Sequence, residues 1–230
     1  MRVGKRLEKI LSLFNNKVGV IADIGTDHGI LAFRILTDLK ADKVIATDIS
    51  EPSLDKAREL KDRYGFGNKF LCMAGDGLKP LKDEKRIDVV IIAGMGGIEI
   101  VKILNQKPSN LEIGSFIFQP MQDAEILREF LISSGYNISV DETVKDRDKF
   151  YSTIKCDGVI APKTTSIEEI VVGKTDRQRF GNDFRQWLEM EITKQESREK
   201  FLSEEKKARL NVLKKLKLEN EEKNNIWKQC

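Results

Sequence analysis

The sequence is poor in the side chains that build metal sites and hydrolytic centres. It contains one histidine and three cysteines in 230 residues. A single histidine, His28, excludes a metal site made from several histidines and argues against a Ser-His-Asp hydrolase. The cysteines at 72, 156 and 230 lie far apart and form no Cys-x-x-Cys pair, which argues against zinc and favours a reducing compartment. We therefore expect no bound metal.

The sequence also lacks long apolar runs and a strong charge of one sign. No apolar stretch approaches the roughly 20 residues that a membrane-spanning helix needs, and the charged segment 1–9 is unlike a secretory signal. A cut after residue 158 leaves 24 basic and 24 acidic residues before it, and 16 basic against 13 acidic after it. We expect a soluble, cytoplasmic protein without membrane contact, whose formal surplus of positive charge lies in its last third.

One segment has the pattern of a strand, a tight turn and a helix. An apolar run over 18–22 leads into Asp-Ile-Gly-Thr-Asp-His-Gly at 23–29, and a helical pattern follows over 30–36. This order opens nucleotide-binding α/β domains. Asp27 stands where a pyrophosphate-binding turn favours glycine, and its carboxylate would repel a phosphate at the helix N-terminus. The same carboxylate suits a ligand with a positive centre, so the turn favours S-adenosylmethionine over NAD.

Four further apolar runs each end in a polar or glycine-rich segment. The segments are Asp48-Ile49-Ser50, Gly75-Asp76-Gly77, Ala93-Gly94-Met95-Gly96-Gly97 and Gln119-Pro120-Met121. Asp48 follows the glycine turn by roughly 20 positions, the spacing at which a carboxylate reaches a ribose diol. Asp76 offers an acceptor for an adenine amino group. Because open parallel sheets bind ligands at the carboxyl ends of their strands, these segments predict one shared site.

Together with Lys149-Phe150-Tyr151, these motifs resemble the bacterial tRNA (adenine-22-N1)-methyltransferase family, TrmK. The resemblance spans roughly residues 1–230 and is strongest before 160. It implies a class I Rossmann-like domain, S-adenosylmethionine as the methyl donor, methylation of N1 of an adenosine in tRNA, and a C-terminal antiparallel coiled coil. The target position, 22, comes wholly from this resemblance. One departure is Gly29, where the family pattern leads us to expect alanine.

The alternation of patterns predicts an α/β fold with a mostly parallel seven-stranded sheet. Segments 135–142 and 150–156 read as a terminal antiparallel pair. We expect a methyltransferase domain over 1–158 and a helical hairpin over 159–230 that turns near 201–205. The hairpin can satisfy itself or pair with another chain, and we expect a monomer.

Basic residues crowd the second helix of this hairpin at positions 206, 207, 209, 214, 215 and 217. Such a stripe can follow a phosphate backbone, which would make the hairpin a tRNA-contacting appendage. An ion-paired, solvated helix face explains it equally well.

The motifs assign two sets of site residues. The donor set comprises Asp23, Gly25, Thr26, His28, Gly29, Asp48, Ile49, Asp76, Gly77, Ala93 and Gly94. The acceptor set comprises Asp27, Gly94, Met95 and Gln119. Adenine N1 has an in-plane lone pair and no proton to lose, so the transfer needs alignment more than a strong base.

Several roles stay open at this point. Asp27 either stabilises the positive charge that the adenine gains or caps the following helix. Gln119 either meets the Watson-Crick edge of the base or belongs to a strand-ending turn. Arg147 and Lys149 can grip phosphate, and Tyr151 either stacks a base or packs within its strand.

Two rival functions share these motifs. A methyltransferase acting on a small molecule or a protein would keep the donor site but bind tRNA weakly. A non-catalytic coiled-coil adaptor would keep the domain only as a scaffold, and the intact donor motifs count against it.

Overall fold

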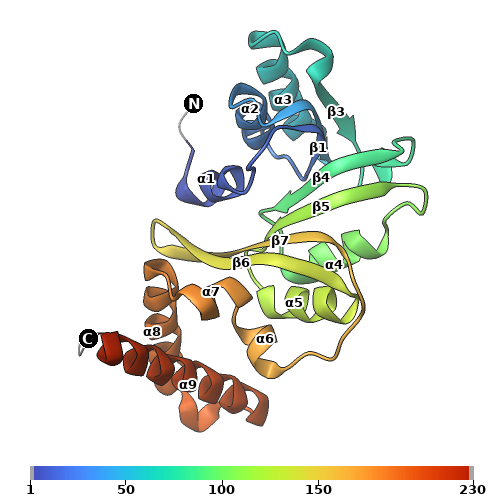
Figure 1. Ribbon diagram of the computed structural model, residues 1–230. Helices are drawn as coiled ribbons and strands as arrows, with labels where there is room; N and C mark the ends of the chain where they lie inside the picture. The colour runs from blue at the N-terminus through green and yellow to red at the C-terminus, as the bar shows by residue number, and fades with distance from the viewer. Residues whose placement is uncertain (1–2, 228–230) are drawn as a thin grey trace.

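The computed structural model describes residues 3–227, with side chains described through residue 221; Cys230 lies outside this range. Its centre is a seven-stranded sheet in the order β3-β2-β1-β4-β5-β7-β6 (Figure 1). The strands are β1 (Val18–Ile24), β2 (Ala41–Asp48), β3 (Phe70–Ala74), β4 (Arg86–Ala93), β5 (Glu112–Gln119), β6 (Tyr136–Asp146) and β7 (Lys149–Val159). Strands β1 to β5 are parallel, and β7 pairs antiparallel with β5 and β6. The predicted α/β fold with a mostly parallel seven-stranded sheet is confirmed.

The α-helices divide into those that cover the sheet and those that follow it. The first group is α1 (Lys5–Ser12), α2 (Ile30–Thr37), α3 (Glu51–Arg63), α4 (Gly97–Asn105) and α5 (Ala124–Ser133). The second group is α6 (Ile167–Val171), α7 (Lys174–Arg179), α8 (Asn182–Glu196) and α9 (Glu204–Trp227). Short 3-10 turns lie at η1 (Gly67–Lys69), η2 (Lys79–Leu81) and η3 (Glu199–Phe201).

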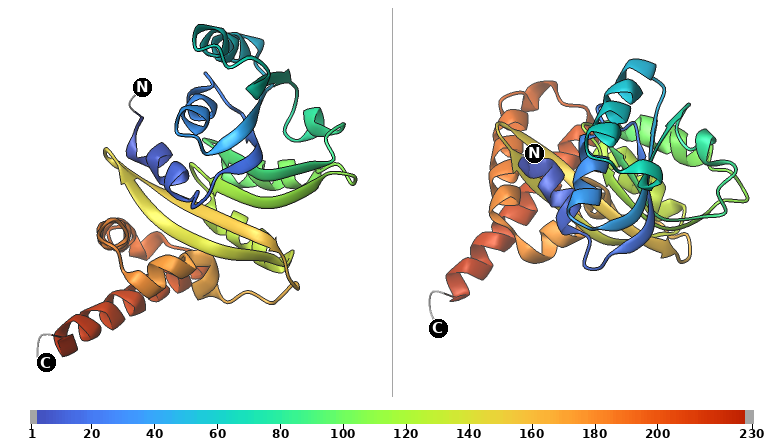
Figure 2. Two further views of the ribbon diagram at one scale, coloured as in Figure 1. Left: turned by 45° about the horizontal axis from the view of Figure 1, so that its top comes forward. Right: turned by 90° about the horizontal axis from the view of Figure 1, so that it is seen from above.

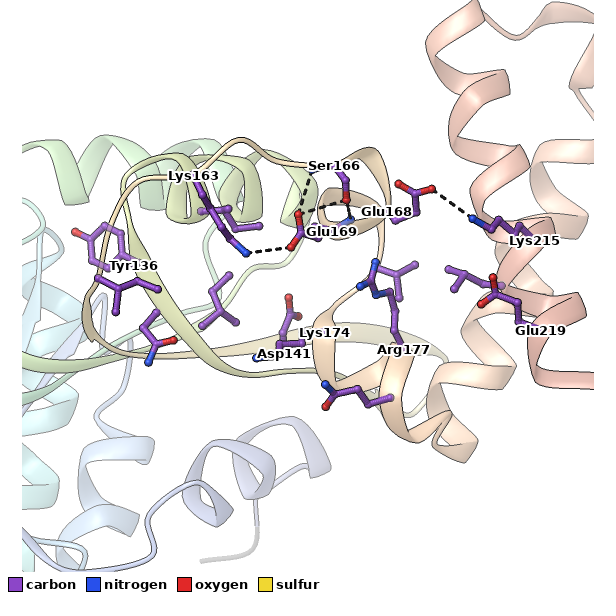
Figure 3. Close-up of a pocket in the computed structure, with 17 residues that line it drawn as sticks. Tyr136, Asp141, Lys163, Ser166, Glu168, Glu169, Lys174, Arg177, Lys215 and Glu219 are labelled. Carbon is purple, nitrogen blue, oxygen red and sulfur yellow. Dashed lines mark hydrogen bonds and ion pairs between the residues drawn. The ribbon is translucent and has the colours of Figure 1, made fainter. Parts of the chain in front are cut away.

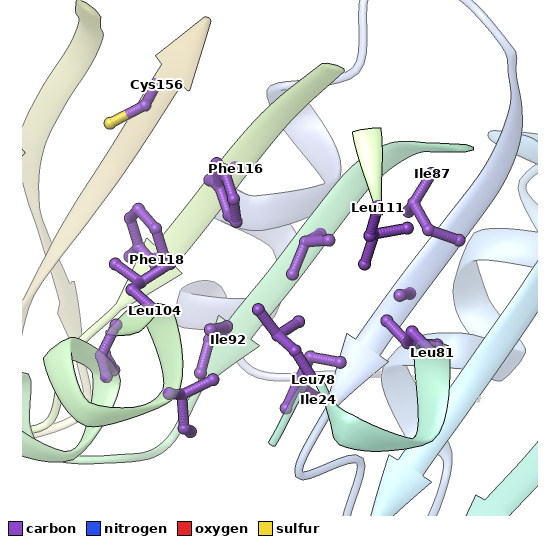
Figure 4. Close-up of a cluster of buried hydrophobic side chains, with 14 of the residues drawn as sticks. Ile24, Leu78, Leu81, Ile87, Ile92, Leu104, Leu111, Phe116, Phe118 and Cys156 are labelled. Carbon is purple, nitrogen blue, oxygen red and sulfur yellow. The ribbon is translucent and has the colours of Figure 1, made fainter. Parts of the chain in front are cut away.

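The apolar strand residues form a separate core on each face of the sheet. Ile45, Ile92 and Phe118 belong to the cluster that packs against α4 and α5 (Figure 4). Val44 and Ile91, their neighbours in the strands, belong to the cluster that includes residues of α1 and α2. This double burial explains why the parallel strands read as continuous apolar runs rather than as alternating patterns.

Helices α7 and α8 cover the outer edge of β6, which has no neighbouring strand, as Figures 1 and 2 show. Three backbone N–H groups of β6, at residues 141, 143 and 145, donate hydrogen bonds to side chains of these helices. The acceptors are Thr175 Oγ1 at 2.9 Å, Asp176 Oδ2 at 2.8 Å and Asp183 Oδ2 at 2.9 Å. Every second residue from 141 to 145 is satisfied in this way, which blocks this part of the edge from pairing with another strand. The helical region therefore docks on the domain partly through polar contacts.

The helical region also has an apolar cluster of its own, formed by α6, α8, α9 and the residues between them. Val172, Phe184, Leu210 and Leu213 are its most buried residues. Helices α8 and α9 are joined through residues 197–203, close to the predicted turn. Coiled-coil packing of the pair stays a prediction.

A cavity of about 630 Å³ lies between the start of β6 and the helices α6, α7 and α9 (Figure 3). Its rim is held together by ion pairs, Lys163 with Glu169 at 3.1 Å and Lys215 with Glu168 at 3.8 Å. The second pair joins α6 to α9. These contacts fix the segment after β7 against the last helix.

Because the buried Asp176 of α7 docks on β6, we predict that the free energy of unfolding depends on pH. An Asp176→Asn variant tests this. Burial raises the pKa of Asp176 from 3.8 to about 7, although the hydrogen bonds from Thr143 lower it. The folded protein therefore holds a proton that the unfolded chain releases, so this group stabilises the fold fully below about pH 4 and that contribution is lost as the pH rises to about 7.

Asparagine accepts the same two hydrogen bonds without a charge. At pH 8 we expect the Asp176→Asn protein to be more stable than the parent by up to about 4 kcal/mol, and the difference to shrink toward pH 5. Urea unfolding at the two pH values measures it. A variant that is less stable than the parent at pH 8 would contradict this account.

Candidate functional site

The turn after β1 is fixed at the edge of the sheet where the parallel strands end, which we call the carboxyl edge. The N–H groups of Gly25 and Thr26 donate to the carbonyl oxygen of Thr47 at 2.8 Å and 2.9 Å. Gly25 has φ of +69°, and a Cβ atom there would overlap with Met95 Cε. The loop after β4 therefore folds over this turn, and the glycine leaves room for that close approach.

Asp48 has a carboxylate whose orientation is set by two backbone N–H groups. Its Oδ2 accepts from the N–H of Asp27 at 3.0 Å, and its Oδ1 accepts from the N–H of Ser50 at 2.9 Å. The next side chain, Ile49, is 76% exposed. This arrangement suits an adenosine. The fixed carboxylate can accept hydrogen bonds from the ribose diol, and the exposed apolar side chain can pack on the adenine ring.

Negative charge gathers around the same turn. Asp23 is buried and accepts a hydrogen bond from Thr26 Oγ1 at 2.6 Å. Burial raises its pKa to about 6; the Thr26 bond lowers it and the charge of Asp48 raises it further. At neutral pH the segment 23–29 thus carries carboxylates and no Lys or Arg. This field favours a cationic ligand over a phosphate.

The structure contradicts the helix-cap role for Asp27. Helix α2 has Gly29 as its N-cap, and no side chain makes a capping hydrogen bond there. Asp27 instead has φ of +54°, and its side chain is 75% exposed with Oδ1 3.3 Å from His28 Nε2. The same His28 nitrogen lies 2.7 Å from Lys56 Nζ. The Asp27 carboxylate is therefore available at the surface of the turn.

Gly29 has a packing role in the structure. A Cβ atom at this position would lie 2.7 Å from Ala57 Cβ and 3.0 Å from Ala57 Cα, and φ is +69°. The start of α2 thus packs directly on α3, which explains why this chain has glycine where we expected alanine.

The end of β3 joins the site through its backbone. The N–H of Gly75 donates to the carbonyl oxygen of Asp48 at 2.9 Å. Asp76 is exposed and its Oδ2 accepts from Lys79 Nζ at 2.6 Å. Gly77 is buried with φ of +56°, and a Cβ atom there would lie 3.1 Å from Ile103 side-chain atoms. Asp76 faces solvent at the carboxyl edge. Gly77 has a packing role, because a side chain there would crowd Ile103.

The loop after Ala93 has an open surface at Gly94. Gly94 is exposed, and a Cβ atom built on it meets no atom within 4 Å. The loop is held by backbone hydrogen bonds, from Gly94 N–H to Gln119 O at 3.2 Å and from Met121 N–H to Met95 O at 2.8 Å. A flat ligand can therefore approach the loop backbone at Gly94, because these two hydrogen bonds hold the loop in place.

The side chain of Gln119 lies inside the protein rather than in the cleft. It is 0% exposed, and its Nε2 donates to Arg6 O at 2.8 Å and to Thr153 Oγ1 at 3.1 Å. Its Oε1 accepts from Arg6 Nη1 at 3.2 Å. The predicted contact with a Watson-Crick edge does not fit this burial. Arg6 was absent from the predicted site because no local pattern links residues 113 positions apart.

Most of the basic residues of α9 lie in ion pairs. Arg209 bridges Glu125 of α5 and Glu191 of α8, at 2.6 Å and 3.0 Å. Lys207, Lys214 and Lys215 also have carboxylate partners. This favours the ion-paired reading of the stripe over continuous contact with RNA.

The site as a whole fits S-adenosylmethionine. Asp48 can bind the ribose, Ile49 the adenine face, and the carboxylates around Gly25 the sulfonium. Among residues 3–221, whose side chains are described, no group of three or more His, Cys, Asp or Glu has the arrangement of a metal site. None of the described helices is long and apolar enough to cross a membrane. Fold and site together define a nucleoside-binding domain of the class I methyltransferase type.

Comparison with known proteins agrees with this class. A family model described as "Methyltransferase domain" matches residues 3–154. The tRNA (adenine(22)-N(1))-methyltransferase of Bacillus subtilis is 31% identical over 149 residues, which are 64% of this chain and 61% of that protein. The chain thus aligns with less than two thirds of that relative's length.

Solved structures share the fold over nearly the whole chain. The structure of M. capricolum TrmK in complex with S-adenosyl-homocysteine has a TM-score of 0.78 at 24% identity, covering 94% of this chain and 96% of that one. The B. subtilis m1A22 tRNA methyltransferase TrmK has a TM-score of 0.79 at 24% identity, covering 94% and 98%. The chain belongs to the family described by this methyltransferase-domain model, and it is similar to the TrmK proteins named above.

Proposed function

We propose that this protein transfers a methyl group from S-adenosylmethionine to N1 of adenosine 22 in tRNA. The observation that carries the proposal is the carboxyl-edge site, in which Asp48 is oriented by two N–H groups beside the turn at Gly25, where Met95 leaves no room for a side chain. The similarity to the B. subtilis enzyme supports N1 of adenosine 22 as the acceptor.

Each residue of the site has a role in binding or alignment. Asp48 accepts hydrogen bonds from the donor ribose, and the backbone at Gly94 and Met95 supports the target adenine. The donor supplies a methyl group bound to a positively charged sulfur. N1 of adenine forms the new bond with its lone pair while the carbon–sulfur bond breaks and sulfur keeps that electron pair, so no base is needed. The exposed carboxylate of Asp27 stabilises the positive charge that the adenine acquires.

The atom that is methylated lies on the Watson-Crick edge, so the adenosine must leave its stack or pair to reach the site. We propose that the domain of residues 1–158 receives the displaced base and that residues 159–230 add contact surface for the tRNA. The protein acts on this substrate as a monomer in the cytoplasm, where tRNA is found.

Methyl transfer to unmodified tRNA tests the function. We expect labelled methyl from S-adenosylmethionine to appear as N1-methyladenosine at position 22, and to be lost when adenosine 22 is replaced by guanosine. Mapping of the product nucleoside separates this result from methylation elsewhere.

The control is a tRNA in which a different adenosine is replaced, which should keep full methylation. Binding of the donor without any transfer to tRNA, under conditions where another tRNA methyltransferase is active, would reject the RNA substrate. A small molecule or a protein would then be the acceptor to look for, because the donor site would still be intact.

A further inference from the structure

A second cavity, of about 430 Å³, lies between α1 and the turn that joins β6 to β7. Its lining includes Arg6 and Leu7 of α1, Arg147 of the turn, and Lys149 and Tyr151 of β7. Among the residues assigned to the donor site, none lines it. The cavity is therefore distinct from the place where Asp48 and Gly25 lie.

The guanidinium of Arg6 is held in this cavity by buried neutral groups. Its Nη1 donates to Gln119 Oε1 at 3.2 Å, and its carbon lies 5.9 Å from the centre of the Tyr151 ring. Gln119 is fixed in turn by Thr153, and both are 0% exposed. A buried amide thus sets the position of a cation that faces the cavity.

Helix α1 is itself fixed to the hairpin of β6 and β7. Asp146 Oδ2 accepts from the N–H of Arg6 at 3.3 Å, close to the start of the helix. Lys9, one turn further on, forms an ion pair with Glu142 of β6. The buried side chains Ile10 and Leu11 hold the opposite face of the helix in the core. Arg6 therefore stands on a rigid support.

Three cations and two carboxylates, Asp146 and Asp148, line this cavity. Asp146 accepts the backbone N–H of Arg6 rather than its guanidinium. Among residues 3–221, no carboxylate forms an ion pair with Arg6, Arg147 or Lys149, whereas Lys9 and Arg34 are both paired. The hydrogen bond to Gln119 and the Tyr151 ring compensate only part of the desolvation of the Arg6 guanidinium, and a bound anion would pair its remaining N–H donors. The planar donors of the guanidinium match the oxygens of a phosphate.

The cavity lies beside the proposed position of the target base. Gln119 is the last residue of β5, and its carbonyl oxygen accepts from the N–H of Gly94 at 3.2 Å. The residue that holds Arg6 thus also holds the open loop after β4. An RNA chain whose base lies at Gly94 has its backbone within reach of this neighbouring cavity.

We propose that Arg6, positioned by Gln119 above Tyr151, binds a backbone phosphate of the RNA substrate next to the target adenosine, together with Arg147 and Lys149. This inference rests on the proposed function and adds to it a phosphate subsite. It also gives Gln119 a task that its burial allows, as a positioning residue for Arg6.

An Arg6→Gln variant tests the subsite. Because a hydrogen bond to a charged group contributes about 1.5–3 kcal/mol, we expect the KM for unmodified tRNA to rise about 10- to 100-fold while the Kd for S-adenosylmethionine stays unchanged. The slope of log affinity for tRNA against log salt should fall by about 1. Arg6→Lys should recover part of the affinity, since a lysine keeps the charge without the planar fork.

The matched control is Arg86→Gln, which removes an exposed arginine at the start of β4, the opposite edge of the sheet. It should leave both constants unchanged. Lys149→Gln, on the cavity wall, provides a second variant should Arg6→Gln fail to fold, and it should weaken tRNA binding in the same direction.

Two results would overturn the subsite. One is an active parent enzyme whose Arg6→Gln and Lys149→Gln variants keep the parental KM for tRNA. The other is a Kd for S-adenosylmethionine that rises about tenfold or more with an unchanged tRNA affinity, because the anion would then be the donor's carboxylate. A parent that methylates no tRNA would instead reject the proposed function itself.

Discussion

Replacing Arg128 by methionine should lower the free energy of unfolding by about 3–5 kcal/mol. Arg128 of α5 and Asp141 of β6 are only 4% and 2% exposed, and their side chains make two hydrogen bonds of 2.8 Å and 3.1 Å. The guanidinium also donates to Ile170 O at 3.2 Å and to Ser152 Oγ at 2.9 Å. It thus joins α5, β6, β7 and α6. Methionine would leave the Asp141 carboxylate buried without its partner.

Urea unfolding of the parent and of Arg128→Met measures the effect. The double variant Arg128→Met/Asp141→Leu is the informative control, because replacing both members of a buried pair with apolar residues removes the uncompensated charge. It should recover most of the stability that the single variant loses. A single variant as stable as the parent would show that the pair does not hold the helical region to the domain.

Replacing Asp48 by alanine should weaken the binding of S-adenosylmethionine at least about 100-fold, because two hydrogen bonds from the ribose to a charged acceptor would be lost at about 1.5–3 kcal/mol each. The substitution also frees the N–H groups of Asp27 and Ser50, which lose their acceptor. Titration calorimetry with S-adenosylmethionine measures the affinity, and the transfer to tRNA should fall in parallel.

The matched control is Asp55→Ala, which removes an exposed carboxylate from α3, the helix that follows Asp48 in the chain. It should bind the donor like the parent. An Asp48→Ala protein that is folded and binds S-adenosylmethionine within about threefold of the parent would remove Asp48 from the donor site, because that difference corresponds to less than one hydrogen bond to a charged group.

Local patterns predicted the strands well because a buried parallel strand needs a continuous apolar run. The run ending at Asp48 became β2 (Ala41–Asp48), and the segment 150–156 lies within β7 (Lys149–Val159). Strand limits were less accurate: 135–142 became β6 (Tyr136–Asp146). In its further residues, the N–H groups of Thr143 and Lys145 donate to side chains of helices far along the chain.

The sequence indicated contacts that depend on one turn and missed those that depend on distant partners, while the donor-binding role of the site residues stays a prediction. Asp48 was found through its spacing from the glycine turn, and it does accept from the N–H of Asp27. Gln119 was expected in the cleft because it ends a strand, yet it is buried against Arg6 and Thr153. Its direction follows from the packing of α1, which no pattern near residue 119 contains.

The sequence by itself determined the order of strands and helices along the chain and the parallel sheet, and it predicts the edge at which ligands bind. These features follow from hydrophobic periodicity and from glycines at positions of positive φ, which are properties of short segments. Only the tertiary structure decided which polar groups meet: Arg6 with Gln119, Arg128 with Asp141, and the side chains of α7 and α8 with the edge of β6. Such pairs join residues up to 113 positions apart, and hydrogen bonding selects them only after the core has brought the elements together.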